Sequence, residues 1–410
     1  MNRLPIRLLL ASLSLLPIGI VVFSTGCATA DSAAVRDVLD DEIVTFDPGT
    51  VPDELVDTLA KRRVVLLGET HYVQEHQELV LTVLKRLHPH GLRWFTQENA
   101  HAYGWIVEDY VLGLRDDYPE SARRMDEYWI ERLRTFNEAL PEAERIRMRY
   151  IDMNHAHDAL LLSLTWMARG SDVGERIDPL VADVLATSPG TDEYEHAVIE
   201  LERRLESQRD TLVDAIGPRW YDRLAEAVEV EIRSLPIRRR HDVHARERIM
   251  IDLAMRTIED AGDSTVAINV GMFHAQKRRY MGTRQEWLGE YLASHADRFG
   301  GADELYSVAF WAFAGERIRT FTDRDPQPVP AAMGRPARNL SRQIAGIVAR
   351  RDGSEHPRSA AFLELSHPLF ARSMRIAFTH SALRAAPGSQ FDAYVIFPEI
   401  SILESIRASW

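Results

Sequence analysis

Two short motifs, each with a histidine three residues after a glycine, place an imidazole directly behind an apolar run. The first is Gly68-Glu-Thr-His71, which follows residues 64–67, and the second is Gly271-Met-Phe-His274. A histidine can act as a general base on water or as a metal ligand, and both roles use the same nitrogen lone pair. His71 and His274 are therefore the first candidates for chemistry.

Acidic residues accompany these histidines at the ends of apolar runs. Glu69 lies inside the first motif, and Glu98 closes the run of residues 92–98. The structural alternative for the first motif is a helix entry, with Thr70 as the cap. Ionisable side chains at the ends of several separate apolar runs are unexpected for packing alone, which favours a functional cluster. The predicted members of this cluster are His71, His274, Glu69 and Glu98.

A further apolar run, residues 146–152, ends at Asp152, and His155 follows three residues later. Aspartate is also a common capping residue at the start of a helix. The sequence therefore supports a functional and a structural role for Asp152 and His155 about equally.

The runs that precede these residues indicate strands of a parallel sheet. Residues 64–68 are a continuous apolar stretch and residues 264–271 are mostly apolar, a pattern typical of strands buried on both faces. The alternation of such runs with helical spacing predicts an α/β fold with a mostly parallel β-sheet flanked by helices. Ligands of such sheets bind at the carboxyl ends of the strands, where both motifs lie. Further strands are expected at residues 92–98, 146–152, 304–314, 360–365 and 393–397.

Residues 172–235 are rich in Glu, Arg, Ala and Leu and contain no convincing strand. We interpret them as a helical insertion that forms a cap over the carboxyl edge of the sheet and shapes a pocket. Another long helix is expected at residues 238–261, which include Arg246. The α/β domain as a whole is predicted to span residues 45–410.

The N-terminus has the composition of a targeting segment. Arg3 and Arg7 precede the apolar residues 8–23, and Ser24-Thr-Gly-Cys27 follows them. The apolar stretch is short for a stable membrane span, so residues 1–27 are predicted to be a signal peptide.

Cys27, the only cysteine, resembles the lipidated cysteine of a bacterial lipobox, with ordinary secretion as the alternative. Residues 28–44, small and acidic, suit a tether between a lipid anchor and the domain. These features predict a protein of the bacterial cell envelope, anchored by lipid at the outer membrane or the periplasmic face. A single cysteine leaves neither an intramolecular disulfide nor a thiolate metal site.

The overall charge restricts the partners. The net charge of −13 would repel nucleic acids and anionic lipid surfaces at long range. With 410 residues and 45% hydrophobic content the chain can bury a large core. We therefore expect a small-molecule substrate and no nucleic-acid partner.

The two Gly-x-x-His motifs, with a glutamate ending the strand between them, resemble the superfamily that joins erythromycin esterases, ChaN haem-binding lipoproteins and TraB/Tiki proteins. The erythromycin-esterase-like branch is the most similar. The resemblance covers most of residues 62–400 and rests on the order and spacing of short motifs. Besides the residues above, these are residues 128–140, Arg246-Glu247 with Met250, Met281-Gly282, and Phe391-Asp-Ala-Tyr-Val-Ile-Phe-Pro-Glu399.

The first motif departs from the esterase pattern. Erythromycin esterases commonly have an extra residue in this motif, a glycine after its histidine and an arginine early in the next helix. This chain has Tyr72 and Val80 at the last two positions. The differences argue against a macrolide substrate and bring the motif nearer to ChaN-like proteins.

Activated water is the simplest nucleophile, because the chain contains no Gly-x-Ser-x-Gly elbow. In a metal-free hydrolase of an ester, lactone or amide, His71 would be the general base, with Glu69 or Glu98 on its other ring nitrogen. His274 and Arg246 would stabilise the oxyanion. The esterase resemblance implies this role for His71.

Three alternatives remain open from the sequence. His71, His274 and a carboxylate, Glu69 or Glu98, could bind a divalent Zn, Mn or Fe ion, as the Tiki resemblance implies. The ChaN resemblance implies a haem- or iron-binding lipoprotein without catalysis, with His71 or Tyr72 as an axial ligand. The third alternative is a purely structural envelope lipoprotein.

Overall fold

The structure of the protein is a computed structural model that describes residues 32–279, 284–318, 326–328, 340–377 and 382–408. The predicted signal peptide and Cys27 lie outside these residues. Within them, no helix combines the length and the apolar character needed to cross a membrane.

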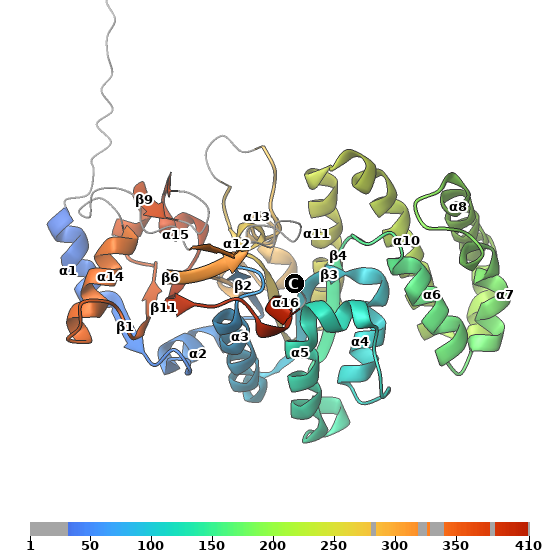
Figure 1. Ribbon diagram of the computed structural model, residues 1–410, viewed down its shortest axis with the longest axis horizontal. Coiled ribbons are helices and arrows are strands. Elements are labelled where there is room, and N and C mark those ends of the chain that lie inside the picture. The colour runs from blue at the N-terminus through green and yellow to red at the C-terminus, as the bar shows by residue number, and fades with distance from the viewer. Residues whose placement is uncertain (1–31, 280–283, 319–325, 329–339, 378–381, 409–410) are drawn as a thin grey trace, which may run out of the picture.

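A mixed sheet forms the centre of the molecule (Figure 1), with nine strands in the part of the chain that is described. Its hydrogen-bonded order is β1-β8-β11-β6-β2-β5-β3-β4, with β7 paired to the end of β6. The strands from β11 to β4 in this order are mutually parallel, and at the other edge β8 runs antiparallel to both of its neighbours, β11 and β1. The predicted mostly parallel α/β fold is therefore confirmed. The strands are β1 Ile43–Phe46, β2 Val64–Glu69, β3 Leu92–Ala100, β4 Arg147–Asp152, β5 Thr265–Gly271, β6 Leu305–Ile318, β7 Pro326–Pro328, β8 Ala360–Glu364 and β11 Ala393–Ile400, beside a separate hairpin of β9 Met374–Ala377 and β10 Ala382–Ala385.

Alternate residues of the central strands enter two separate hydrophobic cores. In β2, Val65 and Leu67 belong to one core, and Val64 and Leu66 belong to the other. Because helices cover both faces, the strand has no solvent side, which explains its continuous apolar run. The first core is covered by α2 Asp53–Leu59, α3 Gln74–Leu87, α4 Gly104–Val111 and α5 Glu120–Glu138. The second core is covered by α1 Ser32–Glu42, α11 Val243–Asp260, α13 Leu288–Ser294 and α14 Leu340–Arg351.

The predicted tether over residues 28–44 is wrong for residues 32–44, which belong to the folded domain. Val35 and Leu39 of α1 are buried in the second core, and the helix packs against α14. Ile43 then begins β1, which pairs with β8. The acidic residues that suggested a tether lie on the exposed face of this amphipathic helix, so composition alone concealed its apolar face.

Residues 172–235 are helical, and the helices lie beyond the edge strand β4 at the green end of the molecule (Figure 1). They are α7 Gly174–Leu185, α8 Asp192–Ser207, α9 Arg209–Ile216 and α10 Pro218–Arg240, of which α7 and α10 pack against α6 Ala159–Gly170. Of these, α10 reaches the carboxyl edge of the sheet. There Glu231 accepts a hydrogen bond from Asn154, and Arg238 donates to the Asn154 carbonyl.

The helix expected at residues 238–261 is interrupted. The chain turns at His241, whose φ of 51° is left-handed, and α11 begins at Val243. The Asp242 side chain caps the new helix by accepting from the Ala245 amide at 3.0 Å. The break places Arg246 in the first turn of α11.

Candidate active site

The two Gly-x-x-His motifs leave the sheet side by side. β2 and β5 are parallel neighbours, and Glu69 on one lies opposite Gly271 on the other. His71 follows β2 in the turn before α3, whereas His274 lies in α12, Met272–Ala275, directly after β5. Histidines about two hundred residues apart in the sequence are thus brought together by one strand pairing.

Glu98 on β3 lies between the two imidazoles. Its Oε2 is 3.6 Å from Nε2 of His71, and its Oε1 is 3.4 Å from Nε2 of His274. β3 continues to Ala100 instead of ending at Glu98, and its register with β4 shifts between Gln97 and Ala100. Such an irregularity redirects a side chain at a strand end, here toward the neighbouring strands.

Each histidine also has a second carboxylate on its other ring nitrogen. Nδ1 of His71 lies 3.1 Å from Oε1 of Glu69, and Nδ1 of His274 lies 2.7 Å from Oε2 of Glu247. The other oxygen of Glu247 accepts from the Leu288 amide at 2.6 Å. The sequence singled out Glu247 only as the neighbour of Arg246 and assigned it no role.

Gly271 is required at this position because of how closely His71 approaches it. A Cβ atom on Gly271 would lie 2.8 Å from Nε2 of His71 and 3.4 Å from Oε2 of Glu98. The Gly271 amide instead donates to Oε2 of Glu98 at 2.7 Å. The glycine of the second motif therefore makes room for the histidine of the first.

Arg246 holds the acidic groups of the cluster together. Its Nη2 forms an ion pair with Oε1 of Glu98, and its Nε lies 3.0 Å from Oδ1 of Asp152. Asp152 in turn accepts from Nε2 of His155 at 2.6 Å. The structure thus brings together all the residues predicted for the cluster, with Asp152 and His155 beside them.

The electrostatics of the two histidines differ. Burial alone would lower the pKa of His274, but the Glu98 and Glu247 carboxylates outweigh it and raise this pKa to about 10. For His71 burial acts in the same sense, and the Glu98 and Glu69 carboxylates again raise the pKa. Although burial disfavours its charge, the pKa of Glu98 lies well below its usual range because His274, His71 and Arg246 surround it.

The two histidines also differ in how exposed their side chains are to solvent. The side chain of His71 is 43% exposed, whereas that of His274 is 10% exposed. An aromatic contact also covers His274, since the Trp287 ring meets it edge-on at 5.3 Å between centroids. A substrate can therefore reach His71 more readily than His274.

Tyr72, directly after His71, has a φ of 63°, which is left-handed and uncommon for a bulky residue. Glycine adopts this conformation without strain. Tyr72 therefore occupies a position that favours glycine.

The donor atoms of the cluster do not fit a divalent metal ion. Both Nε2 atoms, the nitrogens left to bind an ion, face Glu98. The Arg246 guanidinium already lies on Oε1 of Glu98, where a metal would need a free lone pair. In the described ranges, no group of three or more His, Cys, Asp or Glu residues is arranged to hold a metal ion.

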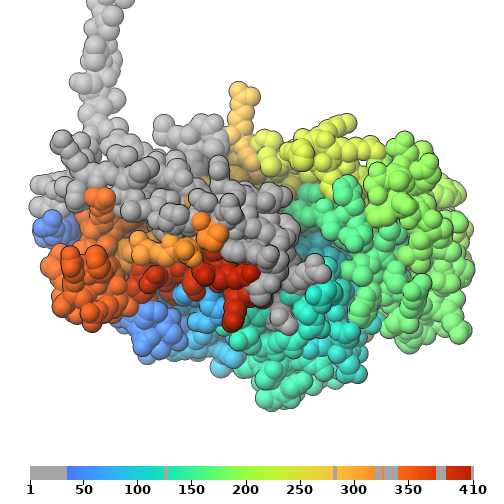
Figure 2. All heavy atoms as spheres, in the orientation of Figure 1, coloured from blue at the N-terminus to red at the C-terminus, as the bar shows by residue number. Residues whose placement is uncertain are grey.

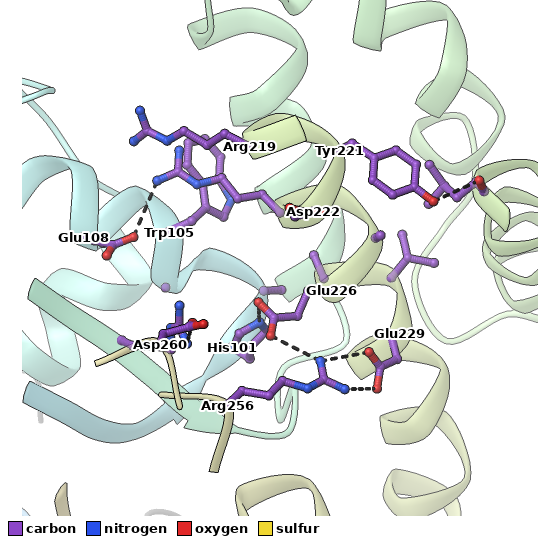
Figure 3. A pocket seen from close by; sticks show the side chains of 18 of the residues that line it. His101, Trp105, Glu108, Arg219, Tyr221, Asp222, Glu226, Glu229, Arg256 and Asp260 are labelled. Atoms are coloured by element: carbon purple, nitrogen blue, oxygen red, sulfur yellow. Dashed lines mark hydrogen bonds and ion pairs between the residues drawn. The ribbon is translucent and has the colours of Figure 1, made fainter. Parts of the chain in front are cut away.

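A cavity of about 780 Å³ lies elsewhere, between β4, α4, α10 and α11 (Figure 3). The residues that line it do not include the predicted site residues. Its charged groups pair across the space: His101 lies 3.2 Å from Glu226, and Arg256 lies 2.8 Å from Glu229. This cavity is a charged junction between the insertion and the sheet, separate from the histidine cluster.

The sequence matches no protein-family model and no curated protein. Solved structures, in contrast, superpose over nearly the whole chain. A protein from Bacillus cereus has a TM-score of 0.67 at 12% identity, covering 90% of this chain and 98% of its own. A succinoglycan biosynthesis protein has a TM-score of 0.63 at 12% identity, covering 90% and 97%.

The third similar structure is a mutant of the erythromycin esterase EreC in its open conformation. Its TM-score is 0.62 at 14% identity, and the alignment covers 88% of this chain and 98% of that one. At such identities the likeness shows the fold alone. The chain therefore has an erythromycin-esterase-like α/β fold.

Proposed function

We propose that this protein is a hydrolase in which His71 activates a water molecule to cleave an ester, lactone or amide bond of a small molecule. The observation that carries the proposal is the asymmetry of the two histidines around Glu98. His71 is half exposed, and His274 is buried between two carboxylates. One imidazole is thus open to substrate, and the other holds a fixed charge.

His71 has the surroundings of a general base. In its neutral form Nδ1–H donates to Glu69, which leaves the lone pair on Nε2. The 3.6 Å between Nε2 and Oε2 of Glu98 is longer than a direct hydrogen bond, so the lone pair can accept a hydrogen bond from a water molecule on the exposed side of the ring. His71 would take a proton from this water as its oxygen attacks the carbonyl carbon, and would return the proton to the leaving group. Such a base contributes roughly 10²–10⁴-fold in rate.

His274 and Arg246 then have different roles. With a pKa raised to about 10, His274 is an imidazolium at neutral pH. Both of its ring nitrogens face carboxylates, so its charge would favour the oxyanion through the electrostatic field and not through a hydrogen bond. The Nε and Nη2 groups of Arg246 are occupied by Asp152 and Glu98. We therefore assign Arg246 to positioning Glu98 instead of contacting the oxyanion, which revises the role expected from the sequence.

The proposal also includes a location in the cell envelope and a class of substrate. Lipidation of Cys27 would hold the enzyme in the bacterial cell envelope, where it would act on a small molecule. The likeness to an erythromycin esterase structure supports a lactone or ester as the first substrate class to test. The bulky Tyr72 beside the base favours substrates other than macrolides.

The test expresses residues 28–410 and follows hydrolysis of a panel of esters and macrolide lactones by mass spectrometry, with and without a chelator. His71→Ala is compared with His90→Ala, a control that removes an exposed histidine outside the cluster. Turnover that resists the chelator, survives in the control and is lost in His71→Ala supports the proposal. Turnover lost to the chelator would instead make His71 and His274 metal ligands.

Haem binding is measured on the same samples, by visible absorbance after addition of haemin. A folded protein that hydrolyses none of the panel and binds haem through His71 or Tyr72 would overturn the hydrolase proposal in favour of a ChaN-like function. Loss of that absorbance in His71→Ala or Tyr72→Phe would identify the axial ligand.

A further inference from the structure

The turn that carries His71 contains a conformation that its own sequence does not favour. Tyr72 is held at a φ of 63°. For a bulky L-residue this region is disfavoured, so a non-glycine residue stays there only when its surroundings hold it. The contacts of Tyr72 should therefore show what fixes the turn.

The surroundings come from the end of the chain. We name residues 401–408 the C-terminal strap; it contains α16, Glu404–Ala408. The Leu403 amide donates to the Tyr72 carbonyl at 2.9 Å, and the Gln74 amide donates to the Ser401 carbonyl at 2.9 Å. Between these bonds Val73 and Ile402 form an antiparallel bridge. The strap therefore pairs with the turn like a short strand.

A side chain at the start of α3 fastens the same strap. One carboxylate oxygen of Glu75 accepts from the Ser401 amide at 2.7 Å, and the other accepts from the Ser401 hydroxyl at 2.8 Å. The strap is thus tied to the chain at the Tyr72 carbonyl and at the three residues that follow it.

Apolar packing completes the contact. Ile318, Ile402, Leu403 and Ile406 form a small buried cluster, separate from the two main cores, and Tyr72 packs against it. The strap lies at the surface near the centre of the molecule, where the red C-terminal residues are visible (Figure 2). The strap contacts the turn but belongs to neither main core. Changes in the strap should therefore affect the turn more than the sheet.

We propose that the C-terminal strap is a positioning element of the active site, which holds Tyr72 in the left-handed conformation and so sets His71 against Glu69 and Glu98. The inference rests on the proposed function for its catalytic consequence. Leu403, through its amide, and Glu75 are the positioning residues, and neither touches the substrate.

The test is a double-mutant rescue. Leu403→Pro removes the amide that bonds the Tyr72 carbonyl, and we expect it to lower kcat by about tenfold because the base is displaced. Tyr72→Gly relieves the need for the strap, since glycine adopts positive φ freely. In the Tyr72→Gly background the same Leu403→Pro change should lower kcat by less than about threefold.

The matched control is Glu404→Pro, which introduces proline one residue later, at the first position of α16, where it is tolerated. This variant keeps the Leu403 amide and should retain the wild-type kcat. If Leu403→Pro does not fold, as judged by its circular dichroism, Glu75→Ala replaces it, because it removes both bonds to Ser401.

A second measurement separates this inference from the proposed hydrolysis. The imidazole titration of His71 is followed by NMR in each variant and needs no substrate. Leu403→Pro should shift the His71 midpoint toward 6.5, since the ring moves away from the carboxylates that raise its pKa, and Tyr72→Gly should restore it. The proposal would be overturned if folded Leu403→Pro had the wild-type His71 midpoint. It would also be overturned if the His71 midpoint of the Tyr72→Gly, Leu403→Pro double variant were shifted as far as that of Leu403→Pro.

Discussion

Glu69 and Gly271 occupy opposite positions on neighbouring parallel strands, so the residues that follow them emerge at the same point of the sheet edge. The two residues have complementary roles. Glu69 supplies the carboxylate for His71, and Gly271 supplies the space into which the His71 ring fits. The glycine of the second motif is therefore required by the histidine of the first.

The closeness of Gly271 to His71 predicts the effect of one methyl group. Gly271→Ala would place a Cβ 2.8 Å from Nε2 of His71, so the ring must move. We expect a loss of roughly 10–100-fold in kcat, since displacement by about an ångström has such an effect. The free energy of unfolding should fall by about 1–3 kcal/mol. Gly346→Ala in α14, where the nearest atom is 3.9 Å away, is the control and should leave kcat unchanged.

The activity of the base should depend on Glu98. In the wild type, kcat/KM should rise with pH with a midpoint above 6.5, because the carboxylates raise the pKa of His71. Glu98→Gln removes the largest of these favourable charges and should move the midpoint to lower pH. Glu200→Gln, an exposed glutamate on α8 paired with Arg203, should leave the profile unchanged. An identical midpoint in Glu98→Gln and the wild type would contradict the assignment of His71 as the titrating base.

The charge on His274 should make the free energy of unfolding depend on pH. Its folded-state pKa is raised to about 10 from 6.5, so the folded state binds the proton more tightly than the unfolded state. The stabilisation is fully present below about pH 6.5 and is lost as the pH rises from there through 10. Urea unfolding at several pH values should show a decline on the order of a few kcal/mol across this window. In His274→Gln the decline should be clearly smaller.

Replacing Glu247 by alanine should lower the free energy of unfolding more than replacing it by glutamine. It is buried and bonds both His274 and the Leu288 amide. Glu247→Ala leaves the buried imidazolium with fewer partners and should cost about 3–5 kcal/mol of unfolding free energy. Glu247→Gln keeps an acceptor for Leu288 and should cost less, while lowering the pKa of His274. Equal losses in the two variants, measured by urea unfolding, would show that charge is unimportant at this position.

The sequence predicts the sheet well because its strands are covered on both faces. The run ending at Glu69 is apolar throughout, and β3 and β4 combine buried apolar residues with charged ones. Glu69, Glu98 and Asp152 meet because parallel strands share one carboxyl edge. Most of the candidate site could be located in this way. The position of α1 could not, since its acidic composition hides the buried Val35 and Leu39.

Other features depend on tertiary contacts that leave little local signal. His241 has a positive φ without being glycine, so the break before α11 is invisible to periodicity. Glu247, which contacts His274, lies in the helix that begins after this break. Asp242, which caps that helix, is a local signal that could have located the break. The bond from the Leu403 amide to Tyr72 is between backbones, and backbone partners are not encoded by residue type.

The early start of α1 also bears on how the protein would sit in the envelope. If Cys27 carries a lipid, residues 28–31 alone separate it from Ser32, the first residue of α1. A fully extended segment of this length spans only about 16 Å. A lipid on Cys27 would therefore hold the first turn of α1 within about this distance of the bilayer surface.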